Sequence, residues 1–183
     1  MAYEMIIDVG SDGERIALLK DKKLVELHQE KNESGNFLVG EIYLGKVKKI
    51  MPGLNAAFVD IGHEKDAFLH YHDLGPYINS LVKITDESLD GKRTNGDLSN
   101  FVLEPETVKT GKINQVLKRN QQLLVQIAKE PISTKGPRLT TEISVAGKYF
   151  ILVPFYDTVN VSKKVSTLDE RKRLKNLGSS LKT

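Results

Sequence analysis

The sequence predicts a mainly β fold with some α-helix, in which a small antiparallel barrel is the central unit. Within 40–70, short runs of strand-forming residues are separated by turn residues. Apolar and basic residues intermingle across 42–50, as in a half-buried strand with a basic outer face. Pro52 and Gly53 then mark a turn, because proline fixes φ and glycine tolerates positive φ. The run 56–69 contains two further strand-like segments.

Two phenylalanines fall within this predicted barrel. Phe58 and Phe68 are ten residues apart on strands that a short turn should bring together. A small barrel with aromatic and basic side chains on one surface is the design of an oligonucleotide-binding fold. If both rings lie on the open face, they form a platform on which bases stack. The alternative is that one or both fill the core, which is the commoner position of phenylalanine.

Outside the central stretch, the first 128 residues are predicted to contain four more strands and one long loop. The loop covers 73–112 and lacks sustained periodicity, with its most disordered part at 90–97. The run 121–128 is predicted to close the barrel. A polar linker at 32–36 follows three strands that are too few to complete a domain. These opening strands are predicted at 3–9, 15–20 and 23–30.

The last third of the chain is predicted to combine short strands with one helix. A basic, turn-rich linker covers 129–142. The helix begins at Leu168 and ends near Gly178, because glycine commonly follows the last helical residue. The residues after it complete no core element, so the chain is expected to be part of a longer protein. Short strands are predicted at 143–145, 149–153 and 159–162.

Composition excludes several classes of protein. The 183 residues are 39% hydrophobic and 28% charged, as in ordinary globular proteins. The absence of cysteine excludes disulfides and thiolate metal sites. No apolar run approaches the roughly 20 residues that a membrane-spanning helix needs, and the start lacks the features of a signal peptide. We therefore expect a cytoplasmic protein without a membrane partner.

The charge is unevenly distributed along the chain. Residues 1–108 contain 12 Lys and Arg against 19 Asp and Glu, whereas residues 109–183 contain 15 against 5. Such a division suggests that the second half contacts a polyanion, since neutralising phosphates releases condensed counterions. The alternative is that a longer chain carries balancing acidic segments elsewhere.

Two other constellations carry weaker hypotheses. Asp8 ends the first strand before a glycine, as a metal-binding aspartate can, but no nearby carboxylate has the spacing of a second ligand. The histidines His63, His70 and His72 lie among carboxylates, but they straddle turns rather than converge. We predict no metal site and no catalytic residue in this chain. A metal-dependent hydrolase centred on Asp8 remains the minor alternative.

The segments GEIYLGKVKKIMPGLNAAFVDIG…AFLH and VQIAKEPISTKGPRLTTEISVAGKYFILVP resemble the ribonuclease E/G family of bacterial endoribonucleases. The resemblance covers nearly the whole chain, is weakest in the long loop, and is nearer to ribonuclease G in the second segment. It implies the start of a ribonuclease H-like domain at 1–36 and an S1 barrel of the oligonucleotide-binding (OB) fold at 37–128. It further implies a truncated, α+β 5′-sensor region at 129–183.

The same resemblance assigns roles to individual residues. Phe58 and Phe68 match phenylalanines that stack on RNA, and Lys135 matches a lysine that contacts RNA. Gly147 and Ile151 match residues beside a pocket for the RNA 5′-monophosphate. At a third sensor position the family often has arginine, and the lysine found here keeps the charge but loses the bidentate fork. That residue is Lys163.

The resemblance implies the RNA-binding, N-terminal portion of an endoribonuclease that cleaves single-stranded RNA in RNA processing and decay. The parent enzyme is expected to be a Mg²⁺-dependent homo-oligomer whose two catalytic aspartates belong to a domain that this sequence lacks. This chain is therefore expected to bind single-stranded RNA, to hold no cofactor and to be inactive alone. The alternative is a stand-alone S1-type RNA-binding adaptor with no catalytic role.

Overall fold

The computed structural model describes residues 2–10, 13–31, 37–93, 98, 100–156 and 158–180. The chain divides into two compact units, Met1–Asn36 and Phe37–Thr183. Each unit is described by itself.

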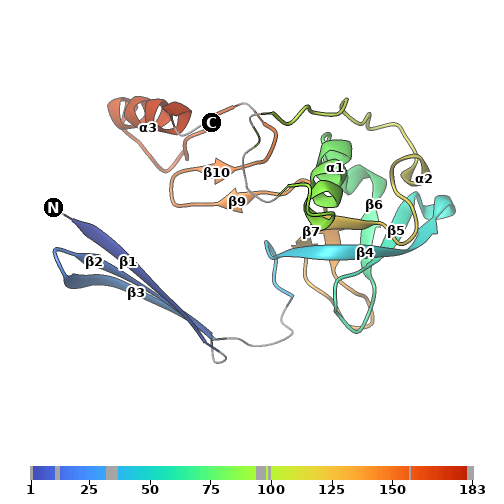
Figure 1. Cartoon of the computed structure of the whole chain (residues 1–183), viewed down its shortest axis with the longest axis horizontal. Coiled ribbons are helices and arrows are strands. Elements are labelled where there is room, and N and C mark those ends of the chain that lie inside the picture. Colours follow the sequence, from blue (N-terminus) through green and yellow to red (C-terminus); the bar gives the residue numbers. More distant parts are fainter. Residues whose placement is uncertain are drawn as a thin grey trace. The chain divides into compact units, whose positions relative to one another are not determined.

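The first unit is a three-stranded antiparallel sheet in the order β1-β2-β3 (Figure 1). Its strands are those predicted, extended by one or two residues at their ends. Apolar residues at consecutive positions of β1 are exposed, so both faces of the sheet present apolar side chains. The strands are β1 Tyr3–Gly10, β2 Gly13–Lys20 and β3 Lys23–Lys31.

The second unit is built on a closed five-stranded barrel in the order β4-β5-β6-β8-β7, closed by the pairing of β7 with β4. Neighbouring strands are antiparallel except for β6 and β8, which are parallel. The mainly β fold and its five-stranded, OB-like barrel are thus confirmed. The strands are β4 Ile42–Met51, β5 Ala56–Asp60, β6 Ala67–His70, β7 Gln122–Lys129 and β8 Arg138–Thr140.

The fifth barrel strand lies where the sequence predicted a linker. Because β8 follows β7, the barrel continues past residue 128, the boundary that the sequence suggested. A strand of three residues is too short to show alternation, and Gly136 and Pro137 before it are turn-forming residues. The middle residue of β8, Leu139, is fully buried in the barrel core.

The barrel core is made by the inward-facing residues of all five strands. A Cβ added at Gly45 would lie 2.6 Å from Cγ1 of Val59, so glycine is needed for the close approach of β4 to the core. The core residues on the strands are Val47, Ala57, Val59, Ala67, Leu69, Leu123, Val125, Ile127 and Leu139.

The prediction of one long loop at 73–112 is wrong for its first part, because residues 78–89 form a helix. Helix α1, Ile78–Leu89, packs against β7 (Figure 1). Its buried residues are Ile78, Ser80, Leu81 and Thr85, so two hydroxyl side chains lie on the buried face beside the apolar ones. Thr85 satisfies its hydroxyl by donating to the carbonyl of Leu81 at 2.7 Å. Residues 94–97 of the predicted disordered tip lie outside the described residues.

Short helical turns complete the barrel unit, and the extended chain after α1 is tied back to that helix. The backbone N–H of Glu104 donates to Oγ of Ser80 at 2.9 Å, and Nζ of Lys83 lies 2.7 Å from Oε1 of Glu104. The turns are η1 Pro52–Leu54, η2 Tyr71–Asp73 and α2 Ile113–Val116.

After the barrel come a small hairpin and a helix. The hairpin strands, β9 Val145–Ala146 and β10 Ile151–Leu152, are antiparallel and shorter than predicted. Helix α3, Leu168–Ser180, runs past Gly178, where the sequence predicted its end. A Cβ at Gly178 would lie 2.6 Å from Cγ1 of Val159, so this glycine permits Val159 to pack closely against the helix. None of the described helices is both long and apolar enough to cross a membrane.

Candidate nucleic-acid interface

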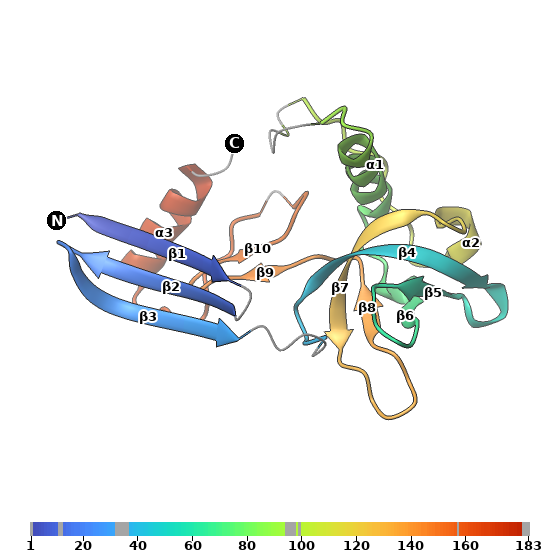
Figure 2. The same cartoon turned by 60° about the horizontal axis from the view of Figure 1, so that its bottom comes forward.

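An open groove of about 870 Å³ lies on the outer face of the barrel, at the loop that joins β7 to β8. Figure 2 shows this loop extending beyond the barrel beside the shorter loop between β5 and β6. The groove combines two aromatic rings with four basic side chains. Its lining residues are Phe58, Lys65, Asp66, Phe68, Lys129, Glu130, Ile132, Thr134, Lys135, Gly136 and Arg138.

Phe58 and Phe68 form an aromatic pair at one wall of this groove. They are direct cross-strand partners on β5 and β6, and their ring centroids lie 5.8 Å apart with the planes inclined at 66°. Both are half-buried, whereas Ala57 and Val59 beside Phe58 are fully buried. The alternation of the strand therefore turns both rings outward, and neither is a core residue.

The aromatic pair is the centre of a row that crosses all five strands. Lys49 of β4 pairs with Phe58, Phe68 pairs with Arg138 of β8, and Arg138 pairs with Lys129 of β7. Paired residues on neighbouring strands project from the same face of a sheet. The outer face thus carries two aromatic side chains flanked by cations on both sides. We call these five residues the stacking row.

Two β-bulges align the ends of the stacking row. The register of β4 shifts between Val47 and Lys49, and that of β7 shifts between Ile127 and Lys129. Each bulge inserts one unpaired residue into its strand. On β4, Val47 therefore pairs with the buried Val59, while Lys49 pairs with the outward-facing Phe58. On β7, Ile127 and Lys129 pair in the same way with Leu139 and Arg138. The sequence alone gave Lys49 a place on a basic strand face, but a bulge has no signal in a single sequence.

Lys135 reaches the groove from a tight turn in the β7–β8 loop. The backbones of Ile132 and Lys135 exchange hydrogen bonds of 3.2 and 2.9 Å. The turn is also tied to the neighbouring loop, because Nζ of Lys65 donates to the carbonyl of Ser133 at 2.9 Å. A Cβ at Gly136 would lie 2.3 Å from the carbonyl oxygen of Asp66, so the two loops approach closely at this glycine.

One acidic group of the groove is neutralised locally. Nζ of Lys48 lies 2.8 Å from Oδ1 of Asp66 and 3.4 Å from Oδ2 of Asp60. The hydrogen bond to Asp66 raises the pKa of Lys48. The pKa of Asp60 is lowered, first by the backbone N–H of Gly62 and then by Lys48. Both carboxylates are thus paired with Lys48, which reduces their repulsion of a polyanion in the groove.

Arg138 is held by a bidentate ion pair, whereas three lysines of this surface make no ion pair with the described residues. Its Nε and Nη2 each donate to the Asp73 carboxylate at 2.9 Å, and this raises the pKa of the guanidinium. Lys49, Lys129 and Lys135 are exposed and make no ion pair with the residues that the structure describes. These three lysines are therefore available to phosphates. The sequence did not indicate Arg138 and Lys129 as groove residues, because both lie in the stretch 129–142 that was predicted to be a linker.

The second group of sequence-predicted residues lies outside the groove, in the hairpin region. The N–H of Gly147 donates to the carbonyl of Phe150 at 2.8 Å, and Ile151 of β10 is 60% exposed. Lys163 is exposed and follows Ser162, whose N–H donates to Tyr149 at 2.8 Å. Backbone hydrogen bonds thus connect the segments that carry these three residues.

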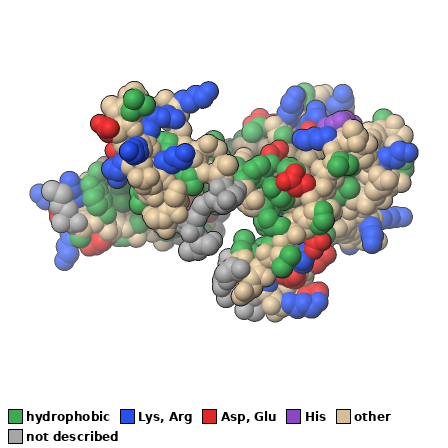
Figure 3. Space-filling model, turned by 90° about the horizontal axis from the view of Figure 1, so that it is seen from above, with side chains coloured by type: hydrophobic (Ala, Val, Ile, Leu, Met, Phe, Trp, Pro, Cys, Tyr) green, Lys and Arg blue, Asp and Glu red, His purple; other side chains and the backbone are tan. Residues whose placement is uncertain are grey.

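Helix α3 adds positive charge to this region, and Figure 3 shows Lys and Arg side chains gathered over it. One of them is structural, because Nη1 of Arg171 donates to the carbonyl of Ser162 at 2.9 Å. The basic residues of the helix are Arg171, Lys172, Arg173 and Lys175.

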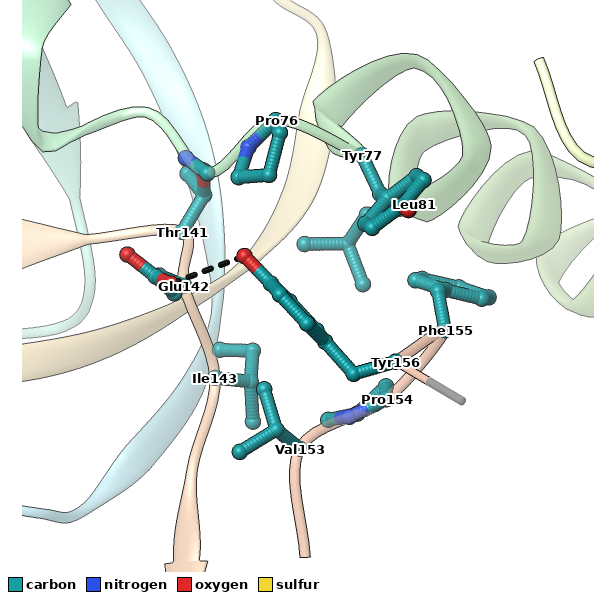
Figure 4. Close-up of a pocket in the computed structure, with 11 residues that line it drawn as sticks. Pro76, Tyr77, Leu81, Thr141, Glu142, Ile143, Val153, Pro154, Phe155 and Tyr156 are labelled. Carbon is teal, nitrogen blue, oxygen red and sulfur yellow. Dashed lines mark hydrogen bonds between the residues drawn. The ribbon is translucent and has the colours of Figure 1, made fainter. Parts of the chain in front are cut away.

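A seam of aromatic side chains joins the segment after β10 to the barrel (Figure 4). The hydroxyl of Tyr156 donates to Glu142 at 3.0 Å, and its ring meets that of Tyr77 edge-on at 5.3 Å. Burial and this hydrogen bond raise the pKa of Tyr156 to about 12. The cavity here is only about 20 Å³, which admits a water molecule rather than a ligand.

The minor hypotheses find little support in the geometry. Asp8 is exposed, and its Oδ2 lies 3.8 Å from Nη1 of Arg15. Among the described residues, no cluster of three or more His, Asp or Glu side chains is arranged to hold a metal ion. His63 contacts Phe37 edge-on at 4.7 Å, whereas His70 and His72 stack on each other at 5.1 Å.

A closed five-stranded barrel with an outward aromatic pair between cations defines the class of the protein, an OB-type barrel. No protein-family model matches the chain. Curated relatives do match: it is 34% identical over 175 residues to ribonuclease G of Salmonella typhimurium and 36% identical over 176 residues to ribonuclease G of Haemophilus influenzae. Each match covers 96% of this chain and 32% of the relative.

A further relative is ribonuclease E of Synechocystis sp., which is 38% identical over 150 residues, or 81% of this chain and 18% of that protein. The chain belongs to the ribonuclease E/G family, near its ribonuclease G members. It spans about a third of the length of the ribonuclease G relatives.

Proposed function

We propose that this chain is the RNA-binding portion of a ribonuclease E/G-type endoribonuclease and that the barrel groove holds single-stranded RNA. The observation that carries the proposal is the stacking row, in which Phe58 and Phe68 project outward between Lys49 and Arg138. Single-stranded nucleic acid binds through this combination of aromatic faces and cations. The family membership, through relatives named as ribonucleases, supports RNA as the ligand.

Binding would use two kinds of contact. A base stacked on an exposed aromatic ring contributes roughly 1–3 kcal/mol, largely independent of sequence. Lys135 and Lys129 would contact phosphates, because they line the groove without an ion-pair partner among the described side chains. The paired Arg138 would contribute its guanidinium plane beside Phe68.

The cleavage of RNA is proposed for the whole enzyme. Mg²⁺ would supply the activated water that hydrolyses the phosphodiester. We assign none of this chain's described residues to the ion, because they form no suitable cluster. We also propose that the β1–β3 sheet begins a ribonuclease H-like domain, that the barrel is an S1 domain, and that the enzyme is a cytoplasmic homo-oligomer.

Gly147, Ile151 and Lys163 are proposed to belong to a 5′-monophosphate sensor. Only Lys163 among them offers a charge, and it is an exposed lysine without the bidentate geometry of arginine. We therefore expect this chain to bind RNA with a 5′-monophosphate and RNA with a 5′-hydroxyl about equally. Isothermal titration with the two RNAs, otherwise identical, measures the difference, and a clear preference for the monophosphate would contradict this expectation.

The proposal is tested by fluorescence anisotropy with labelled single-stranded RNA. The double variant Phe58→Ala/Phe68→Ala should lose most of its affinity while its circular dichroism spectrum is unchanged, because neither ring is a core residue. Tyr3→Ala is a matched control, since Tyr3 is an aromatic residue that is 61% exposed in the other unit. Unchanged affinity of the double variant would remove the stacking platform from the account.

A further inference from the structure

The aromatic surface continues beyond the groove along β6. Phe68 and His70 are two positions apart on this strand and share its outer face. Their ring centroids lie 6.3 Å apart with the planes inclined at 31°, and His70 and His72 stack at 5.1 Å and 15°. The rings of Phe58, Phe68, His70 and His72 therefore form one continuous series, of which only the two phenylalanines line the groove.

The two imidazoles are held in place by the start of η2. The backbone N–H of His72 donates to Nδ1 of His70 at 3.1 Å, and this bond fixes the orientation of the His70 ring. Between them Tyr71 is buried, with its hydroxyl 2.6 Å from the carbonyl of Val108 and its ring edge-on to His72 at 6.3 Å. His70 is half-buried and His72 is exposed. The stacked rings of His70 and His72 are thus held in a fixed arrangement at the surface before any ligand binds.

We propose that His70 and His72 form a further nucleobase-stacking position, which extends the RNA-binding site past Phe68. This inference rests on the proposed function of the groove. Unstacked bases in single-stranded RNA stack on histidine as well as on larger aromatic rings.

A binding cycle tests the position by combining protein variants with single-stranded RNA in which one nucleotide at a time is abasic. His72→Ala should weaken binding of the intact RNA about fivefold or more. One abasic position should weaken binding to the unaltered protein but have no further effect on His72→Ala. His72→Phe should keep both the affinity and the sensitivity to that position, because no hydrogen bond of the His72 ring to a described residue is lost. His28→Ala is the control, an exposed histidine of the other unit.

The outcomes separate this inference from the proposed function. If His72→Ala binds intact RNA as tightly as the unaltered protein while Phe68→Ala weakens binding, the histidine position is refuted and the groove remains. Equal losses in His72→Phe and His72→Ala would also refute stacking by this residue. If neither Phe68→Ala nor His72→Ala weakens binding, both proposals fail.

Discussion

Substitution of Gly136 tests whether the contact between two loops positions Lys135 for RNA. In Gly136→Ala the new Cβ would lie 2.3 Å from the carbonyl oxygen of Asp66 and 3.0 Å from that of Lys65. Both neighbours are backbone atoms, so the β7–β8 loop must move by the better part of an ångström. Overpacking of this kind costs about 1–3 kcal/mol. Part of that cost should appear as displacement of the turn that carries Lys135.

Gly53→Ala is a matched control, because a Cβ at Gly53 meets nothing within 4 Å. We expect Gly136→Ala to lower the free energy of unfolding in urea and to weaken RNA binding, measured by anisotropy, whereas Gly53→Ala changes neither appreciably. A loss of affinity in Gly136→Ala should be small if Lys135 is already alanine, since the two changes then remove the same contact. If Gly136→Ala binds RNA normally, the loop contact does not position Lys135.

Three further predictions concern charge, pH and packing. Lys135→Ala should lower the slope of log affinity against log salt by about 0.7, the value for one phosphate contact on a single strand, and an unaltered slope would exclude such a contact. The pKa of Tyr156 is raised above the usual value near 10, so its contribution to stability is complete below pH 10 and is lost as the pH rises towards 12. Urea unfolding across that range should show a decline that is smaller in Tyr156→Phe; equal declines would contradict the assignment. Gly45→Ala should destabilise the barrel by about 1–3 kcal/mol, because the new Cβ would meet core side chains. An unchanged melting temperature would contradict this prediction and show that β4 can shift to accommodate the methyl group.

The sequence was most informative where strands are long and their composition is regular. The barrel and the three opening strands were predicted because their strand-forming runs end at clear turn residues. Phe58 and Phe68 were found as a pair for the same reason, since two strands joined by a short loop place them opposite each other. Their outward orientation was left open by the sequence and is decided by the burial of the residues on either side of each phenylalanine along its strand.

Other features depend on contacts that a sequence pattern does not encode. Helix α1 was missed because polar residues share its buried face, and their hydroxyl groups are satisfied only in the folded chain. The strand β8 was missed because three residues show no alternation. Gly178 was predicted to end a helix, yet its role is set by Val159, a residue that the helix meets only in three dimensions.

The central claim is that RNA bases stack on Phe58 and Phe68, and nuclear magnetic resonance tests it most directly. In protein labelled only at phenylalanine, titration with a short single-stranded RNA should shift the ring signals of these two residues. Intermolecular Overhauser effects to base protons should accompany the shifts. Phe101 and Phe155 do not line the groove, and their ring centroids lie 5.9 Å from each other. The signals of these two rings should therefore be unaffected. RNA binding that leaves the Phe58 and Phe68 signals unchanged would contradict the account.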